Sequence, residues 1–263
     1  IDAETDGLFG FDDIGIPNGV DTFTIGANTY AIVAAFNDNG IQILDVSVPS
    51  DIYANGYLVD IPSLTLAGAS DVDTFTIDGS TYAIVAAFDE NGVQIIDISN
   101  PAYPSPAGKL IDSGFTTTLA GASGVDTFTI GANTYAIVAS VLDNGVQIIN
   151  ISNPAFPSTA GSLIDSWFAN TLAGASGVDT FTINGSTYAI VAAANDNGVQ
   201  IIDISNPASP NPIQQATDGL LGFDALSGAY GVETVTIDAR TYAIVASKGD
   251  NAVQMIDVSD PTN

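Results

Sequence analysis

Carboxylates are the residues of this sequence whose types and spacing could carry chemistry. The chain has 263 residues, with 30 Asp and Glu, three Lys and Arg, no His and no Cys. Without imidazole or thiol groups, the sequence excludes a His-based catalytic triad, disulfides, and His or Cys metal ligands. Catalysis or metal binding would therefore use the oxygen atoms of Asp, Glu and Asn, which are the ligands that Ca²⁺ accepts.

Two sets of carboxylates recur along the chain. The first set follows the Val that opens a recurring phrase such as VDTFTI, and it consists of Asp21, Asp73, Asp126, Asp179 and Glu233. The second set precedes an Asn in a recurring turn, and it consists of Asp38, Glu90, Asp143, Asp196 and Asp250. We expect both sets to lie on one face of the molecule, where their like charges repel each other. Bound cations would relieve that repulsion, so these ten residues are predicted candidate calcium ligands. They do not match an EF-hand loop, and turn caps with solvated surface acids are the alternative interpretation.

A third recurring carboxylate predicts a structural role. It is found at Asp45, Asp97, Asp203 and Asp257, and Asn150 takes its place in the third copy. Since an amide can replace the carboxylate, we expect these side chains to hydrogen-bond the turn that follows. The Asn after each acid of the second set is expected to adopt the left-handed conformation that tight hairpins require.

Five copies of one unit position these acids. The copies begin near residues 20, 72, 125, 178 and 232, at spacings of 52 to 54 residues. Each contains β-forming segments such as 21–25, 30–36 and 41–47, and the copies before the fifth continue into a Pro-rich loop, a short fourth segment such as 108–113 and a linker such as LAGAS. Four antiparallel strands per unit of this length are typical of a propeller blade. The sequence predicts an all-β, five-bladed β-propeller that forms a single domain over residues 1–263.

The first residues of the chain repeat a later segment. IDAETDGLFGFD at 1–12 and IQQATDGLLGFD at 213–224 are identical at eight of 12 positions. Residues 1–6 therefore align with the fourth strand of a unit, whereas the chain ends after the third strand of the fifth unit. We expect residues 1–6 to join the last blade and close the ring, which leaves no sheet edge unpaired. A segment cut from a longer repeat array is the alternative.

The net charge limits the partners of the protein. A formal charge of −27 repels nucleic acid and anionic membrane surfaces, so neither is expected as a partner. No apolar run approaches the roughly 20 residues of a membrane-spanning helix. An acidic, hydrated surface favours an extracellular or cell-surface location.

The third segment of each unit resembles a known repeat. GVQIIDISNPA at 92–102 is similar to the LVIVD-type repeat, a propeller-blade family of secreted and cell-surface proteins of archaea and bacteria. The likeness extends over all five units, with a longer connection between the third strand and the next unit. This resemblance implies a surface or secreted binding domain, and the family has no shared catalytic motif.

These observations predict a non-catalytic, extracellular or cell-surface module for binding or assembly, with a protein or glycan ligand and with Ca²⁺ as a candidate cofactor. No catalytic residue is assigned, because the acids recur almost identically in every unit, which argues against one specialised pair. One alternative is a carbohydrate-active enzyme that uses carboxylates at the central channel. Another is a purely structural module of a larger surface protein.

Overall fold

The computed structural model describes residues 15–114, 117–165 and 170–262, and the described elements are all β-strands. The first sheet contains β1 (Pro17–Ile25), β2 (Asn28–Ala35), β3 (Gly40–Asp45) and β4 (Tyr53–Val59). The second contains β5 (Ala69–Ile77), β6 (Ser80–Ala87), β7 (Gly92–Asp97) and β8 (Ser105–Ile111). The third contains β9 (Ala122–Ile130), β10 (Asn133–Ser140), β11 (Gly145–Asn150) and β12 (Ser158–Ile164).

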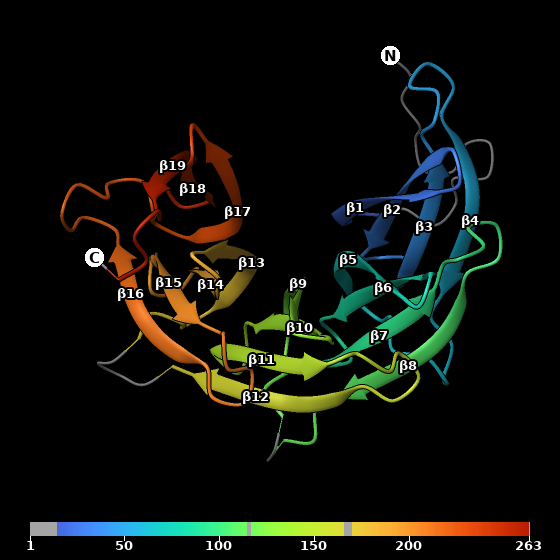
Figure 1. Cartoon of the computed structure of the whole chain (residues 1–263), viewed down its shortest axis with the longest axis horizontal. Helices are drawn as coiled ribbons and strands as arrows, with labels where there is room; N and C mark the ends of the chain where they lie inside the picture. The colour runs from blue at the N-terminus through green and yellow to red at the C-terminus, as the bar shows by residue number, and fades with distance from the viewer. Residues whose placement is uncertain (1–14, 115–116, 166–169, 263) are drawn as a thin grey trace. The chain divides into compact units, whose positions relative to one another are not determined.

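Two further sheets follow in the same order. The fourth contains β13 (Ala175–Ile183), β14 (Ser186–Ala193), β15 (Gly198–Asp203) and β16 (Asn211–Thr217). The fifth contains β17 (Ala229–Ile237), β18 (Arg240–Ser247) and β19 (Ala252–Asp257). Consecutive strands pair antiparallel within each sheet, as the labelled strands of Figure 1 show. The predicted all-β, five-bladed β-propeller class is confirmed, and the sheets are called blades one to five below. The predicted pairing of residues 1–6 with the last blade lies outside the described residues.

The chain divides into two compact units. One comprises residues 1–112 and 151–158, and the other comprises residues 113–150 and 159–263. The first unit contains blades one and two, and the second contains most of blade three together with blades four and five. The single domain expected over residues 1–263 stays a prediction. No helix in the described ranges is both long and apolar enough to cross a membrane.

The first strand of each blade is longer than the sequence suggested. β1 begins at Pro17 rather than Asp21, and β5 begins at Ala69, inside the LAGAS segment that was expected to act as a linker. The extra residues pair with the end of the second strand across an irregularity in register, for example between Pro17 and Gly19 in blade one. Ala69 is fully buried, so burial extends the strand beyond the β-branched residues that mark it in the sequence.

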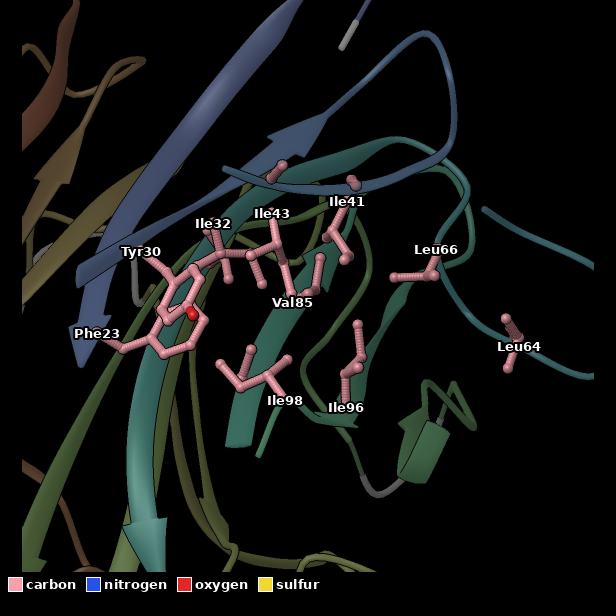
Figure 2. Packing of buried hydrophobic residues seen from close by; sticks show 14 residues of the cluster. Phe23, Tyr30, Ile32, Ile41, Ile43, Leu64, Leu66, Val85, Ile96 and Ile98 are labelled. Atoms are coloured by element: carbon pink, nitrogen blue, oxygen red, sulfur yellow. The ribbon is translucent and has the colours of Figure 1, made fainter. Parts of the chain in front are cut away.

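Neighbouring blades of one unit bury apolar side chains against each other. Figure 2 shows this packing between blades one and two, with Phe23, Tyr30, Ile32 and Ile43 from the first blade and Val85, Ile96 and Ile98 from the second. Phe23 and Tyr30 are cross-strand neighbours, and their rings stack with centroids 5.4 Å apart. Because both faces of a blade are covered, the second and third strands need nearly continuous apolar residues. This explains the recurring TYAIVA and VQII phrases.

Ile16 has a left-handed backbone conformation that glycine adopts in the other blades. Its φ is 50°, whereas the matching positions in the other blades are glycines with φ between 62° and 69°. In each blade this residue accepts a backbone hydrogen bond from the residue that follows the second strand, as Ile16 does from Phe36. The left-handed conformation is therefore required there, and a β-branched side chain is costly in it.

We expect Ile16→Gly to stabilise the protein by about 1 kcal/mol, because it removes a left-handed strain of roughly 1–2 kcal/mol from a side chain that is largely exposed. Urea unfolding of the variant measures the change. Ile16→Ala is the control, since it keeps the Cβ atom and so should recover little of that strain. A variant with Gly that is less stable than the natural chain would contradict this explanation.

Candidate functional site

The second set of acids caps the loop that enters its own blade. Each carboxylate accepts the backbone N–H of the residue 23 positions earlier, as Asp38 does from Gly15. The same contact is made at 3.2 Å by Glu90 with Ala67, at 2.9 Å by Asp143 with Ala120 and by Asp196 with Ala173, and at 2.8 Å by Asp250 with Ser227. These carboxylates therefore hold the hairpin turn between the second and third strands to the loop before the first strand.

The Asn that follows each of these acids has the predicted left-handed backbone. Its φ lies between 51° and 54° at Asn39, Asn91, Asn144, Asn197 and Asn251. The side chain has a second role that the turn signal alone did not predict. Asn39 Oδ1 accepts the N–H of Gly68 at 2.8 Å, and Asn197 Oδ1 accepts that of Gly228 at the same distance. Asn39, Asn144 and Asn197 thereby link their turns to the entry of the next blade.

The first set of acids occupies the middle of the first strand, which corrects the prediction that it stands at the strand start. Asp21 is the fifth of nine residues of β1 and lies opposite Ile32. The strand reaches further back because Pro17 and Gly19 also pair with Ala35 and Ala34 of the second strand. Asp21 and Asp38 therefore lie at different levels of the blade, one in the middle of β1 and the other in the turn after β2.

Carboxylates of the first set bind the first strand of the next blade. Asp21 Oδ2 accepts the backbone N–H of Thr74 at 2.9 Å and its hydroxyl at 2.5 Å. Asp126 Oδ2 likewise accepts the backbone N–H of Thr180 at 2.8 Å, and Asp179 Oδ2 accepts that of Thr234 at 2.7 Å. The first strand is an edge of its sheet, and these N–H groups would otherwise lack a protein acceptor. Asp73 and Glu233 take the same strand position.

The hydrogen bonds to backbone N–H groups show that these carboxylates have a structural role, and they do not by themselves form a metal centre. Within residues 15–114, 117–165 and 170–262, no three Asp or Glu side chains gather as an ion site would require. Calcium binding by the ten acids stays a prediction.

Asp179 is an acid of the first set whose surroundings shift its pKa. Burial raises its pKa above the ordinary value, and hydrogen bonds from Thr234 and Thr180 and the contact with Asp126 oppose that rise. Charging a carboxylate away from water is unfavourable, whereas hydrogen bonds to the charged form favour it. Asp126 and Asp179 therefore form a neighbouring carboxyl pair in the second unit.

The third carboxylate bonds the following turn, as predicted. Asp45, Asp97 and Asp203 each accept the backbone N–H of the Ser two residues later at 2.9 Å, and Asp257 does so at 3.0 Å. In blade one the Tyr53 hydroxyl also donates to Asp45 at 2.9 Å. Hydrogen bonds from Ser47 and Tyr53 lower the pKa of Asp45, although burial acts in the opposite direction.

This shift predicts a pH dependence. The folded pKa of Asp45 lies below its unfolded value, so its contribution to stability is present above the unfolded pKa and is lost as pH falls through the folded one. We expect Asp45→Asn to cost about 1 kcal/mol at pH 7, because a charge-assisted hydrogen bond is replaced by a neutral one. Urea unfolding at neutral pH and near pH 3 measures this cost, which should shrink in acid. A cost that is equal at both pH values would contradict the prediction, and the exposed Asp51→Asn is the control.

A buried Gln in the third strand is an important residue that the sequence reasoning missed. In blade three, Gln147 donates from Nε2 to the carbonyls of Ile148 at 3.0 Å and Gly161 at 2.7 Å, and its Oε1 accepts the N–H of Thr118 at 2.9 Å. Gln94 and Gln200 make the equivalent contacts in blades two and four. The constant Gln inside an otherwise apolar phrase was the available signal.

Four segments of the chain match the LVIVD repeat, at residues 28–56, 79–110, 133–165 and 185–217. Each match runs from the second strand of a blade into its fourth strand. No curated protein was found to match the chain.

Several solved structures share the fold at low sequence identity. A functionally unknown protein from Desulfotomaculum acetoxidans has a TM-score of 0.60 and 11% identity, over 92% of this chain and 69% of its own. An exo-β-1,3-galactanase from Phanerochaete chrysosporium has a TM-score of 0.58 and 10% identity, over 91% of this chain and 59% of its own. The allergen Mala s 1 from Malassezia sympodialis has a TM-score of 0.58 and 13% identity, over 92% of this chain and 77% of its own. At these identities the likeness concerns the fold alone. The chain therefore contains four LVIVD repeats, one in each of blades one to four.

Proposed function

We propose that this chain is a non-catalytic module for binding or assembly that acts outside the cell or at its surface. The hydrogen bonds of the recurring acids support this function, because most of these carboxylates accept backbone N–H groups that hold blades and turns in place. A catalytic pair needs two carboxyls with different environments. Carboxylates that recur at the same position in successive blades stabilise the fold instead.

The main support for the proposal is a pair of exposed aromatic residues on loops that are held in place by hydrogen bonds. Tyr103 and Phe156 are each 78% exposed, and both belong to the first unit. They occupy matching positions in the loops that follow β7 and β11. Aromatic side chains of this kind are typical anchors in binding surfaces.

Both loops are held in one conformation before any ligand binds. The Tyr103 N–H donates to the Asn100 carbonyl at 2.9 Å, and the Ala102 N–H donates to the Asn100 side chain at 3.3 Å. The Phe156 loop repeats this arrangement around Asn153, at 3.0 Å and 3.2 Å. Proline follows each aromatic residue directly. Because the loops are already ordered, little conformational entropy is lost on binding.

The test is incubation of the protein with a broad glycan panel, measuring both retention and released product. We expect retention without product, weakened at least about tenfold in the Tyr103→Ala/Phe156→Ala double variant, since truncating an aromatic anchor commonly costs more than 1 kcal/mol. Ser209→Ala, at the matching loop position of blade four, is the control. Product release would contradict the proposal, as would retention that the double variant leaves unchanged.

The charge of the molecule restricts the proposed partners to neutral or cationic proteins and glycans. The three basic residues all make internal contacts. Lys109 donates to the carbonyls of Ser63 and Leu64, Arg240 pairs with Asp257 at 2.8 Å, and Lys248 lies over the ring of Tyr230. With a net charge of −27, the protein is not expected to bind nucleic acid or an anionic membrane surface.

One observation favours a second candidate function, a carbohydrate-active enzyme. Asp126 and Asp179 are neighbouring carboxyls, and burial raises the pKa of Asp179. Glycoside hydrolysis uses two carboxyls, and a raised pKa suits the one that acts as the general acid. The galactanase named above is an enzyme of this kind with a similar fold. Product formation that is abolished by Asp179→Asn would support this function.

Calcium binding is proposed as an addition to the binding module rather than as its basis. The ten recurring acids supply oxygen ligands and a strongly negative local field. A melting temperature that rises with millimolar calcium and falls with a chelator would support it, and one that neither reagent moves would exclude it.

A further inference from the structure

Two adjoining hollows lie beside the loop that follows the last strand of blade five, and the first of them is also lined by the hairpin of blade four. The first has a volume of about 340 Å³ and is lined by Asn184, Tyr188, Asp260 and Thr262, among others. The second has a volume of about 440 Å³ and is lined by Arg240, Asp257, Ser259 and Asp260. Ser259 and Asp260 line both hollows. Both volumes fall within the range of small-ligand sites.

The fifth repeat departs from the others at residues that line these hollows. Asp260 stands where blades two to four have Asn, and Thr262 stands where they have Ala. Arg240 stands where the four earlier repeats have Asn or Ser. The earlier residues are Asn100, Asn153 and Asn206 for the first position, Ala102, Ala155 and Ala208 for the second, and Asn28, Ser80, Asn133 and Ser186 for the third. Because blades fold with the smaller or neutral residues, the blade itself does not require the three changes.

The altered residues retain hydrogen-bonding capacity for a ligand. Asp260 Oδ1 accepts the backbone N–H of Thr262 at 3.2 Å and its hydroxyl at 2.7 Å, which fixes the carboxylate in place. An ionised carboxylate has about four lone-pair sites, so it can accept further donors. Arg240 pairs with Asp257 through one nitrogen, and its side chain is 65% exposed, so other guanidinium N–H groups remain accessible. Asn184 and Tyr188 add an amide and an aromatic ring.

The chemistry of this lining favours a neutral ligand rich in hydroxyl groups. Two carboxylates and one guanidinium lie together, and the guanidinium is already paired with Asp257, so an anionic ligand would meet net negative charge. Hydroxyl groups can donate to the carboxylate and accept from the guanidinium and the amide at the same time. We propose that the two hollows form one binding site for a neutral saccharide, in which Asp260 and Arg240 bind hydroxyl groups and Tyr188 contacts a sugar ring.

This inference rests on the proposed binding function and names one of its ligand classes. The test is isothermal titration of the full chain with three neutral trisaccharides, β-1,3-galactotriose, laminaritriose and cellotriose, and with trigalacturonic acid as the anionic comparison. We expect at least one neutral trisaccharide to bind, and trigalacturonic acid not to bind. The Asp260→Asn/Thr262→Ala variant restores the residues of the other repeats, so it should fold normally and bind at least about tenfold more weakly, as expected when hydrogen bonds to a charged group are lost.

Asn206→Asp places the same charge at the matching position of blade four and is the control, with binding expected to be unchanged. Equal binding by the natural chain and the double variant would overturn this site and leave the binding function intact. Failure of all the neutral trisaccharides to bind would also overturn this site. The proposed binding function is tested separately, by retention of the protein on the glycan panel. Release of shorter products from a bound trisaccharide would contradict both.

Discussion

Replacing Gly161 by Ala is expected to lower the free energy of unfolding by about 2–3 kcal/mol, because the added methyl group overlaps a neighbouring backbone. A Cβ atom at this position would lie 2.4 Å from the carbonyl oxygen of Pro207 and 3.0 Å from Pro210 Cδ. The glycine therefore lets the fourth strand of blade three approach the Pro-rich loop of blade four. Since the nearest atom belongs to the backbone, a side-chain rotation cannot relieve the overlap.

Gln214→Ala is the matched control for this prediction. Gln214 takes the same strand position in blade four, where the structure already accommodates a long side chain, and its Nε2 makes one exposed contact at 3.4 Å with Thr262. Its loss should change stability by less than about 0.5 kcal/mol. Urea unfolding of both variants supplies the comparison, and a Gly161→Ala variant as stable as the natural chain would show that the two blades do not pack this closely.

Gln147→Leu is expected to cost about 3 kcal/mol, because each buried polar group left without a partner costs roughly 1–3 kcal/mol. Gln147 is 1% exposed, and its amide satisfies the N–H of Thr118 and the carbonyl of Gly161. Leucine has a similar size, so the packing would be largely kept while these two groups lose their partner. Equilibrium unfolding in urea measures the loss.

Gln254→Leu tests whether the effect of Gln147→Leu comes from these buried bonds. Gln254 has the same place in β19, but it is only partly buried, and its side-chain amide donates to Met255 at 3.1 Å. The leucine variant there should be nearly neutral, since water can satisfy any group that it leaves. Equal losses at Gln147 and Gln254 would mean that leucine is disfavoured in this strand for another reason.

The fold could be predicted from the sequence because its signals are local and repeated. The turn residues and apolar runs of each repeat indicated three strands, and the Pro-rich loop indicated where the fourth begins. The left-handed Asn39 and the bond from Asp45 to the next turn were also predictable, since both depend on residues one or two positions away. The start of β1 at Pro17 was not, because Pro17 and Gly19 pair with Ala35 and Ala34 of β2 across a register shift that the sequence does not mark.

The uses of the recurring acids depended on contacts far along the chain. Asp21 bonds Thr74, 53 residues later, and Asp38 bonds a residue 23 positions earlier. A carboxylate that accepts a backbone N–H and one that binds a cation have the same sequence signature, so spacing alone left both interpretations open. The hollows around Asp260 were missed for a similar reason, since the lining of the first comes from two blades and that of the second joins Arg240 to residues 17 to 20 positions later.

Asp21, Asp126 and Asp179 of the first strands join their blades to the next one by accepting N–H groups at the edge of its sheet, and this is the central claim. Native-state hydrogen exchange of the Thr180 amide, in the natural chain and in Asp126→Ala, tests this claim most directly, because Asp126 is the acceptor of that amide at 2.8 Å. We expect exchange at Thr180 to become at least about tenfold faster in the variant, as the loss of a hydrogen bond to a charged group implies. The Thr187 amide, which donates to Ser205 within blade four, should exchange as before. Unchanged exchange at Thr180 would contradict the account.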